Sequence, residues 1–213
     1  MKNLLLVFIF VNCLVFPGAR TFAVTVDEEI RKIQKSYESI KDIKGDFVQK
    51  SFIKDLKRTD TYKGRFFIKI PKKLRWEYKG EALQEVFIHN DEILIYQKKE
   101  KQAFRGKFDW NTYGHAPIAL LSGFRKIQDE FSLSLQNGNL LLKPKQTMGE
   151  ILSVEIVPSK GEFPISSFTI KDFHSNIIKI ILKDIKINTN LKDTLFIPSL
   201  PEGTKIYEHS TRD

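Results

Sequence analysis

Side chains able to carry catalysis are few in this 213-residue chain and form no recognisable set. Its four histidines are scattered along the sequence, at His89, His115, His174 and His209. They show no metal-ligand spacing with acidic or cysteine partners, and the sequence contains no glycine-serine elbow or phosphate-binding glycine loop. Asp172, Asp184 and Asp193 fall near expected turns and strand ends, where turn chemistry is their commoner role. We therefore predict no enzyme activity, no catalytic residue, no metal and no cofactor.

The chemistry that the sequence favours is the binding of apolar groups, and residues 64–78 show this best. Two short amphipathic strands flank Pro71 in this segment. Because side chains alternate along a strand, each strand has an apolar row on one face and Arg or Lys on the other. The two apolar rows are Phe66, Ile68 and Ile70, and Leu74, Trp76 and Tyr78. Such a pair of strands lines either a packed core or an apolar ligand.

The elements that position these rows are mainly strands. One helix is indicated by apolar residues at steps of three and four, which are Ile30, Ile33, Tyr37 and Ile40. We expect Asp27 to cap this helix and Lys44-Gly45 to end it. Asn90-Asp91 and Asn137-Gly138 predict tight turns between apolar runs. Besides the two strands around Pro71, we predict strands over residues 47–53, 84–89, 93–97, 131–136, 139–143, 151–157, 163–171 and 177–187.

Evenly spaced strands without alternating helices predict a mainly β (α+β) fold, with one large antiparallel sheet curled toward a barrel. No linker or repeat divides residues 24–213, so we expect a single domain. A second, short helix is predicted from Pro117 to Gly123, since proline suits a first helical turn and glycine a terminus. Its Ile118, Leu120 and Leu121 make it apolar on most sides, so we expect it to lie as a lid over an apolar surface.

The N-terminus has the three-part pattern of a secretory signal peptide over residues 1–23. Lys2 precedes an apolar run from Leu4 to Phe16, which is too short to span a bilayer, and small residues precede the cleavage site near Ala23. A buried N-terminal helix is the alternative interpretation. The single cysteine, Cys13, lies inside this run, so cleavage would leave a chain without disulfides. We predict an exported protein of a bacterial periplasm.

The charge of the chain argues against nucleic acid as a partner. Without Lys2 and Arg20, 33 of the 35 basic residues remain against 26 acidic ones, a net charge of +7. This excess is spread out and forms no recognisable nucleic-acid-binding module. It fits a solvated basic face, with attraction to an anionic membrane surface or an acidic partner as the alternative.

Segments in a fixed order resemble the LolA family of outer-membrane lipoprotein carriers across almost the whole exported chain. After the helix these are Gly45-Asp-Phe47-Val-Gln49-Lys, Gly64 to Tyr78, the strand pair through Tyr96, Leu-Leu-Ser-Gly123, Leu140 to Pro144 and Phe196 to Gly203. The segment around Pro71 and Trp76 is the most specific of them. The resemblance implies an unclosed, strongly curved antiparallel β half-barrel with helices lying across its concave side.

The resemblance also implies a function. The protein would be a monomeric periplasmic chaperone that takes acylated lipoproteins from an inner-membrane lipoprotein-releasing ABC transporter (LolCDE-like). It would deliver them to an outer-membrane lipoprotein receptor (LolB-like), if one is present. A periplasmic lipid-binding or envelope-stress sensor module of similar half-barrel fold is the alternative, and a lipid-modifying enzyme would need a catalytic set that the sequence lacks.

Family and pattern together predict two sets of site residues. The acyl cavity and its lid would be lined by Phe47, Phe66, Ile68, Ile70, Leu74, Trp76, Tyr78, Val86, Ile88, Ile118, Leu120 and Leu121. Core packing is the rival interpretation for each of these. Lys72, Lys73 and Arg75 are candidate partner-binding residues on the turn and the outer face, with ordinary solvation as the rival.

Ile70 departs from the family pattern, which often has a lid-holding arginine directly before the proline. The inner row of this chain is therefore wholly apolar. In one interpretation, lid closure rests on apolar packing and the carrier is otherwise ordinary. In the other, the cavity holds its ligand more tightly, because no buried guanidinium needs hydrogen-bond partners. Arg75 does not replace the missing arginine, since its parity with Leu74 and Trp76 points it outward.

Overall fold

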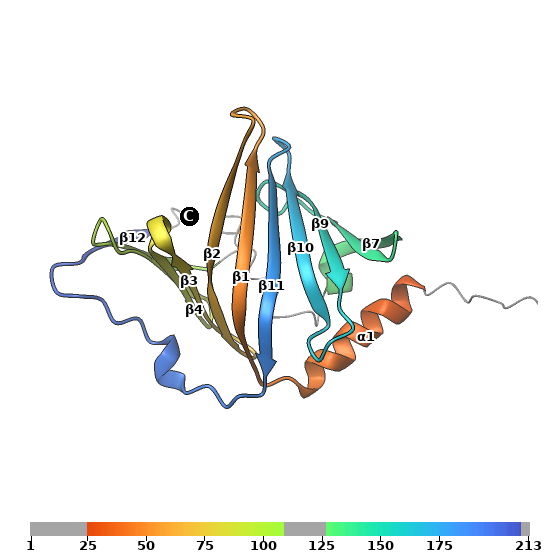
Figure 1. The fold of residues 1–213 in the computed structure, drawn as a ribbon, viewed down its shortest axis with the longest axis horizontal. Helices are drawn as coiled ribbons and strands as arrows, with labels where there is room; N and C mark the ends of the chain where they lie inside the picture. Colours follow the sequence, from red (N-terminus) through yellow and green to blue (C-terminus); the bar gives the residue numbers. More distant parts are fainter. Residues whose placement is uncertain (1–24, 109–126, 210–213) are drawn as a thin grey trace, which may run out of the picture.

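Twelve strands form one curved sheet in the computed structural model, which describes residues 25–108 and 127–209 (Figure 1). The first half of the chain contributes α1 (Val26–Ser39), β1 (Asp42–Ile53), β2 (Arg58–Lys69), β3 (Lys73–Lys79), the short 3₁₀ helix η1 (Gly80–Ala82), β4 (Gln84–His89), β5 (Glu92–Gln97) and β6 (Gln102–Lys107). The second half contributes α3 (Ile127–Glu130), β7 (Phe131–Gln136), β8 (Asn139–Pro144), β9 (Ile151–Pro158), β10 (Ile165–Asp172), β11 (Ile177–Ile187), the 3₁₀ helix η4 (Asp193–Phe196) and β12 (Lys205–His209).

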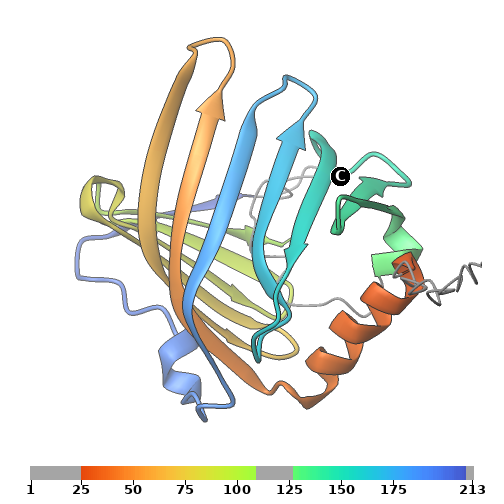
Figure 2. The same ribbon diagram turned by 45° about the vertical axis from the view of Figure 1, so that its right-hand side comes forward.

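The sheet is open, as the half-barrel expectation requires. Its strand order is β12-β6-β5-β4-β3-β2-β1-β11-β10-β9-β8-β7, and its two edge strands, β12 and β7, are not paired with each other. The strands curve around one side of the molecule, and α1 runs along the lower edge near β9 and β7 (Figure 2). The mainly β, unclosed, strongly curved architecture is therefore confirmed.

One strand departs from the antiparallel expectation. β12 pairs with β6 in parallel, with Lys205 opposite Gln102 and His209 opposite Gly106. A parallel pair needs a long crossover connection. Residues 188–204 provide the final part of it, because this C-terminal segment leaves β11 at the centre of the sheet and reaches the far edge at β6.

The first helix forms where its apolar periodicity predicts, but both of its ends were predicted wrongly. Thr25, not Asp27, is the N-cap, and its side chain and that of Glu28 form a reciprocal capping box. Asp27 lies in the first turn, where acidic residues favour the positive end of the helix dipole. The helix ends at Ser39 and not near Lys44-Gly45, because these two residues already belong to β1.

The predicted turns between β4 and β5 and between β7 and β8 are confirmed. Asn90, Asn137 and Gly138 have positive φ angles of 58°, 52° and 80°. Asn and Gly adopt this conformation more readily than other residues, which is why Asn-Gly favours two-residue hairpins. The pairing of Gln136 with Asn139 fixes the register of the second hairpin.

Each face of the sheet has its own apolar cluster. The large one, here called the concave cluster, joins buried residues of α1 to one face of most strands, and it includes Ile33, Phe47 and Trp76. The small one, here called the outer cluster, lies on the opposite face of β4, β5 and β6. It consists of Phe87, Leu94, Tyr96 and Ala103, with Leu200 of the C-terminal segment packed against it.

Hydrogen bonds hold the start of the C-terminal segment to the sheet. The buried carboxylate of Asp42 accepts bonds from the backbone N–H groups of Thr189 (2.7 Å) and Leu191 (3.2 Å), and from the Thr189 hydroxyl (3.0 Å). Burial raises the pKa of Asp42, but these hydrogen bonds outweigh it, so the pKa lies below its ordinary value. The carboxylate therefore acts as an ionised clasp between β1 and the C-terminal segment.

Two predicted segments lie outside the described residues: the signal peptide (1–23) and the lid helix (117–123). Within the two described ranges, no helix combines the length and apolar character that a bilayer crossing requires.

Candidate functional site

The alternating residues of β2, β3 and β4 converge on the concave face, as their sequence pattern predicts. Phe66 pairs with Trp76 and Trp76 with Val86, while Ile68 pairs with Leu74 and Leu74 with Ile88. These pairs make two parallel apolar rows across the sheet. All six side chains are buried, and Phe66, Ile68 and Trp76 are completely buried.

Aromatic rings form the centre of this surface. The Trp76 ring stacks on that of Phe47 at 4.0 Å between centroids and on that of Phe66 at 5.6 Å. The Tyr78 ring meets Phe47 edge-on at 5.3 Å. Stacked and edge-on pairs of this kind add stability beyond simple burial. The result is a rigid aromatic floor built from neighbouring strands.

Two glycines make room for these rings. A Cβ atom on Gly64 would lie 2.4 Å from the Phe47 ring and 1.9 Å from the Glu77 carbonyl oxygen. A Cβ on Gly45 would lie 2.9 Å from the ring of Phe66. No side chain fits at either position without displacing an aromatic ring or the neighbouring backbone.

A few polar atoms border the apolar floor. The Tyr78 hydroxyl donates to Gln49 Oε1 at 2.9 Å, and Gln49 Nε2 donates to the Ser51 hydroxyl oxygen at 3.0 Å. Burial raises the pKa of Tyr78 to about 12, so its hydroxyl stays protonated. The indole Nε1 of Trp76 is buried near this hydroxyl but makes no well-formed hydrogen bond to a residue of the described chain. This region therefore places a buried indole N–H beside the polar chain of Tyr78, Gln49 and Ser51.

α1 extends the same apolar surface. Its buried residues Ile30, Ile33 and Tyr37 belong to the concave cluster, and the Tyr37 ring meets that of Phe163 edge-on at 5.7 Å. The cluster is therefore continuous from the helix to the central strands. An apolar ligand on this face would have to share or displace part of that packing.

The structure brings together all the predicted cavity residues that it describes. They belong to the concave cluster or pack against it: Phe47, Phe66, Ile68, Ile70, Leu74, Trp76, Tyr78, Val86 and Ile88. Ile70 and Tyr78 are only partly buried. The predicted lid residues Ile118, Leu120 and Leu121 lie outside the described residues.

Sequence reasoning missed other parts of the same surface. Ile43, Ile93, Phe168 and Ile180 are equally buried members of the concave cluster, from β1, β5, β10 and β11. Alternation within those strands was the available signal. It was overlooked because the segment around Pro71 has a clearer pattern.

The three candidate partner-binding cations all make contacts within the protein. Lys72 pairs with Asp91 at 3.0 Å and Lys73 with Asp193 at 3.1 Å. The Lys69 and Lys73 ammonium groups lower the pKa of Asp193 through hydrogen bonds. A partner that recruited Lys72 or Lys73 would compete with these exposed pairs.

Arg75 is more strongly held than the two lysines. It points outward, as its parity predicts, but only 23% of its side chain is exposed. Its guanidinium contacts Glu77 (2.7 Å), Glu85 (3.4 Å) and the Leu195 carbonyl oxygen (3.3 Å), and lies over the Phe87 ring at 5.2 Å. Arg75 therefore anchors the C-terminal segment to the outer face.

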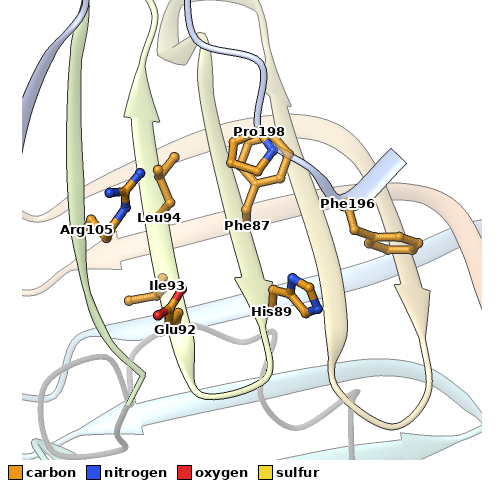
Figure 3. A pocket seen from close by; sticks show the side chains of 8 residues that line it. All are labelled: Phe87, His89, Glu92, Ile93, Leu94, Arg105, Phe196 and Pro198. Carbon is orange, nitrogen blue, oxygen red and sulfur yellow. The ribbon is translucent and has the colours of Figure 1, made fainter. Parts of the chain in front are cut away.

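Two cavities lie between the C-terminal segment and the outer face. The smaller has a volume of about 220 Å³, and Figure 3 shows Phe87, Leu94 and Arg105 of the strands and Phe196 and Pro198 of the segment around it. The other has a volume of about 340 Å³ and is bordered by the charged side chains of Arg75, Glu85 and Lys98. Ligand pockets usually measure about 300–1,000 Å³ and are mainly apolar. The first cavity is smaller than this range, and the second lies near its lower limit beside charged groups.

The described part of the chain offers no alternative metal centre. Residues 25–108 and 127–209 contain no group of three or more His, Cys, Asp or Glu side chains placed to hold a metal ion. The concave face itself offers apolar contacts and a few hydrogen-bond donors and acceptors.

Known proteins are similar to this chain in sequence and in fold. It is 22% identical to the outer-membrane lipoprotein carrier protein of Halorhodospira halophila, over 84% of this chain and 86% of that protein. It is 25% identical to the protein of the same name from Helicobacter hepaticus, over 82% and 88%.

A solved structure supports the fold. The crystal structure of an uncharacterized conserved protein from Thermus thermophilus superposes with a TM-score of 0.54 at 13% identity, covering 86% of this chain and 98% of that one. Residues 38–199, which include every strand from β1 to β11, match the family of the outer membrane lipoprotein carrier protein LolA. The chain therefore belongs to the LolA family.

Proposed function

We propose that this protein is a non-catalytic carrier that shelters the acyl chains of lipoproteins on its concave apolar face. The observation that carries this proposal is the continuous concave cluster, whose central aromatic floor comes from neighbouring strands of an open sheet. Membership of the LolA family supports the same cargo, since two relatives are named lipoprotein carriers.

The energetics of acyl chains explain why a carrier is needed. Each methylene that leaves water contributes roughly 0.8 kcal/mol, so exposing a 16-carbon chain costs on the order of 10 kcal/mol. Several such chains do not cross an aqueous compartment unprotected. A cavity that recovered all of that free energy would not release its cargo, so partial filling by the protein's own residues is an advantage. α1 contributes such residues through Ile30, Ile33 and Tyr37.

The polar groups of the concave face suit the other end of a lipid. The Trp76 Nε1–H is a buried donor, and an ester carbonyl oxygen of an acylated cysteine is a matching acceptor. The chain of Tyr78, Gln49 and Ser51 lies beside the same ring and offers further hydrogen bonds. In our proposal these groups orient the glyceryl ester while the apolar rows contact the chains.

The proposed route follows from the cargo. The protein would be exported through a signal peptide at residues 1–23 and would work in the periplasm as a monomer. It would receive lipoproteins from an inner-membrane ABC exporter and deliver them to the outer membrane, through a receptor if one exists. Lys72 and Lys73 remain proposed partner contacts, and Arg75 would take part only if its internal ion pairs opened.

Mild cross-linking in cells followed by pull-down of the exported protein tests this function. We expect triacylated lipoproteins to copurify, and mass spectrometry of extracted lipids to find acyl chains attached to peptides. A matched sample of the Trp76→Ala variant should recover less cargo. Copurification of a signalling protein without acylated cargo would favour a sensor, and recovery of free glycolipid would indicate a broader lipid shuttle.

Ile70 offers a test of how tightly cargo is held. It is partly buried against the concave cluster, and its N–H donates to the Lys41 carbonyl oxygen at 3.0 Å. Lipoprotein release can be compared between the wild type and Ile70→Arg, with Ile70→Leu as the control. Slower release by the wild type than by Ile70→Arg would show that the wholly apolar inner row strengthens retention of the cargo. Equal release by the two proteins would show that this row does not change retention.

A further inference from the structure

Two hairpin turns lie side by side at one end of the sheet. The β1–β2 turn (residues 54–57) and the β10–β11 turn (173–176) are neighbours because β1 pairs with β11 up to Phe52 and Ile177. Both hairpins rise above the rest of the sheet at the same end, away from α1 (Figures 1 and 2). We call these two turns the hairpin tips.

Each hairpin tip exposes a large apolar side chain. Leu56 is 60% exposed and Phe173 is 59% exposed, and Ile177 beside them is 36% exposed. Turn positions normally favour Gly, Pro, Asn, Asp or Ser, which gain hydrogen bonds or backbone freedom there. A leucine and a phenylalanine at adjacent tips gain nothing comparable from the fold.

The tips are fixed in this arrangement by hydrogen bonds. The Asp172 carboxylate accepts bonds from both the backbone N–H and the side-chain amide of Asn176, each at 2.8 Å. Asn176 Oδ1 in turn accepts a bond from the backbone N–H of Lys54 at 3.0 Å, which joins the two turns. The Phe173 N–H donates to the Glu150 carbonyl oxygen at 3.1 Å. The exposed side chains of the two tips therefore lie on turns whose backbone is held by hydrogen bonds.

The surroundings of the tips are basic. Residues 50–58 and 171–179 contain six lysines or arginines and two aspartates. One of these aspartates, Asp172, is buried and bonded to Asn176, and the other, Asp55, is exposed on the first turn. Lys50 and Lys179 stand directly opposite each other across β1 and β11, a like-charge pair that disfavours the fold.

The nearby acidic groups cancel only part of this charge. Asp60 pairs with Arg58 at 3.0 Å, and the exposed carboxylate of Glu150 offsets one of the lysine charges. Lys50, Lys54, Lys57, Lys171 and Lys179 remain as exposed cations around Leu56 and Phe173. Apolar side chains ringed by lysines match the interface of an anionic bilayer, where rings and aliphatic groups enter between headgroups and cations meet phosphates.

We propose that the hairpin tips dock the protein on the surface of an anionic lipid bilayer, with Leu56 and Phe173 entering the interface. This surface is separate from the concave face and does not depend on acyl-chain carriage. A carrier with such tips would hold its cargo next to the membrane while the cargo is transferred.

Flotation of purified, delipidated protein with vesicles tests the proposal. We expect binding to phosphatidylcholine vesicles that contain phosphatidylglycerol, weaker binding to pure phosphatidylcholine, and loss of binding as salt rises. The double variant Leu56→Ser/Phe173→Ser should bind about tenfold more weakly or worse. Ile197→Ser is the matched control, because Ile197 is 62% exposed on the C-terminal segment.

Charge variants separate docking by the tips from general attraction of a basic protein. Lys54→Glu/Lys57→Glu should weaken binding about tenfold, whereas the same exchange at the exposed Lys99 and Lys107 should change it little. Circular dichroism checks that all variants stay folded. Failure of the wild type to bind anionic vesicles would overturn the proposal, as would equal binding by wild type and Leu56→Ser/Phe173→Ser. Binding to an acidic protein with no binding to vesicles would assign the tips to a protein partner instead.

Discussion

Arg75 and Trp76 are neighbours in β3, yet they lie on faces of the sheet that are built in different ways. Trp76 is fully buried on the concave face, where its contacts are stacked rings. Arg75 lies on the outer face, where two glutamates, a carbonyl oxygen and the Phe87 ring hold it. One face is packed by shape and apolar area, and the other is fastened by directional polar bonds.

This difference between the two faces has a consequence for function. Apolar contacts are non-directional, so a covering group on the concave face can be exchanged for another apolar group with little preference for geometry. Ion pairs and hydrogen bonds require particular partners, so the C-terminal segment stays in one place on the outer face. A carrier needs this combination of an exchangeable face and a permanent one.

Trp76→Ala should have the largest effect on stability. Truncating a buried tryptophan leaves a cavity beneath Phe47 and Phe66 and should lower the free energy of unfolding by about 3–5 kcal/mol. Urea denaturation followed by circular dichroism measures this. A loss below about 1 kcal/mol would mean that the concave face is loosely packed in the empty protein.

Gly64→Ala should follow. The new Cβ would lie within 2.4 Å of the Phe47 ring and 1.9 Å from a backbone oxygen, so ring or strand must shift, at about 3 kcal/mol. Gly161→Ala is the matched control, because the nearest atom to its Cβ is Ser159 Oγ at 3.4 Å. Equal unfolding midpoints for the two variants would contradict the tight fit of the aromatic floor.

Arg75→Ala should destabilise the outer face by about 2 kcal/mol, because it removes the bond to Leu195 and one cation from Glu77 and Glu85. Arg65 and Lys98 still pair with these glutamates, which limits the loss. Acyl-chain binding should not change. Lys72→Ala, which breaks only an exposed pair with Asp91, should alter stability by less than about 1 kcal/mol. Weaker acyl binding by Arg75→Ala would show that the two faces are coupled.

Asp42→Asn should have a smaller effect than Arg75→Ala, about 1 kcal/mol at neutral pH, and a distinctive pH dependence. The folded pKa lies below the unfolded value of about 3.9, so the carboxylate's stabilising contribution is fully present above that pH. It is lost as pH falls through the folded pKa. Unfolding free energies of both proteins should therefore converge in acid, and a constant difference across pH would refute the ionised clasp.

The concave face could be predicted from the sequence because strand alternation is local. Phe66, Ile68, Leu74 and Trp76 share a face whatever the rest of the chain does, since the side-chain period is two. The capping box of Thr25 and Glu28 could also have been predicted from the sequence, because Thr-x-x-Glu before an apolar run is its usual signature. The prediction of Asp27 as the cap overlooked that spacing.

The outer face could not be predicted, because its contacts join residues far apart in the chain. Asp42 meets Thr189 across 147 positions, and Arg75 meets Leu195 across 120. The parallel pairing of β12 with β6 depends on the path of the whole C-terminal segment. Nothing in the local pattern of Lys205–His209 distinguishes a parallel from an antiparallel partner.

Fluorescence quenching tests the central claim most directly. The chain has two tryptophans, so Trp110→Phe leaves Trp76 as the single reporter in the aromatic floor. Acyl chains brominated along their length quench tryptophan only at contact, and unbrominated chains are the control. We expect saturable quenching of Trp76 by the brominated chains alone. Bound chains that leave Trp76 emission unchanged would contradict acyl binding on the concave face.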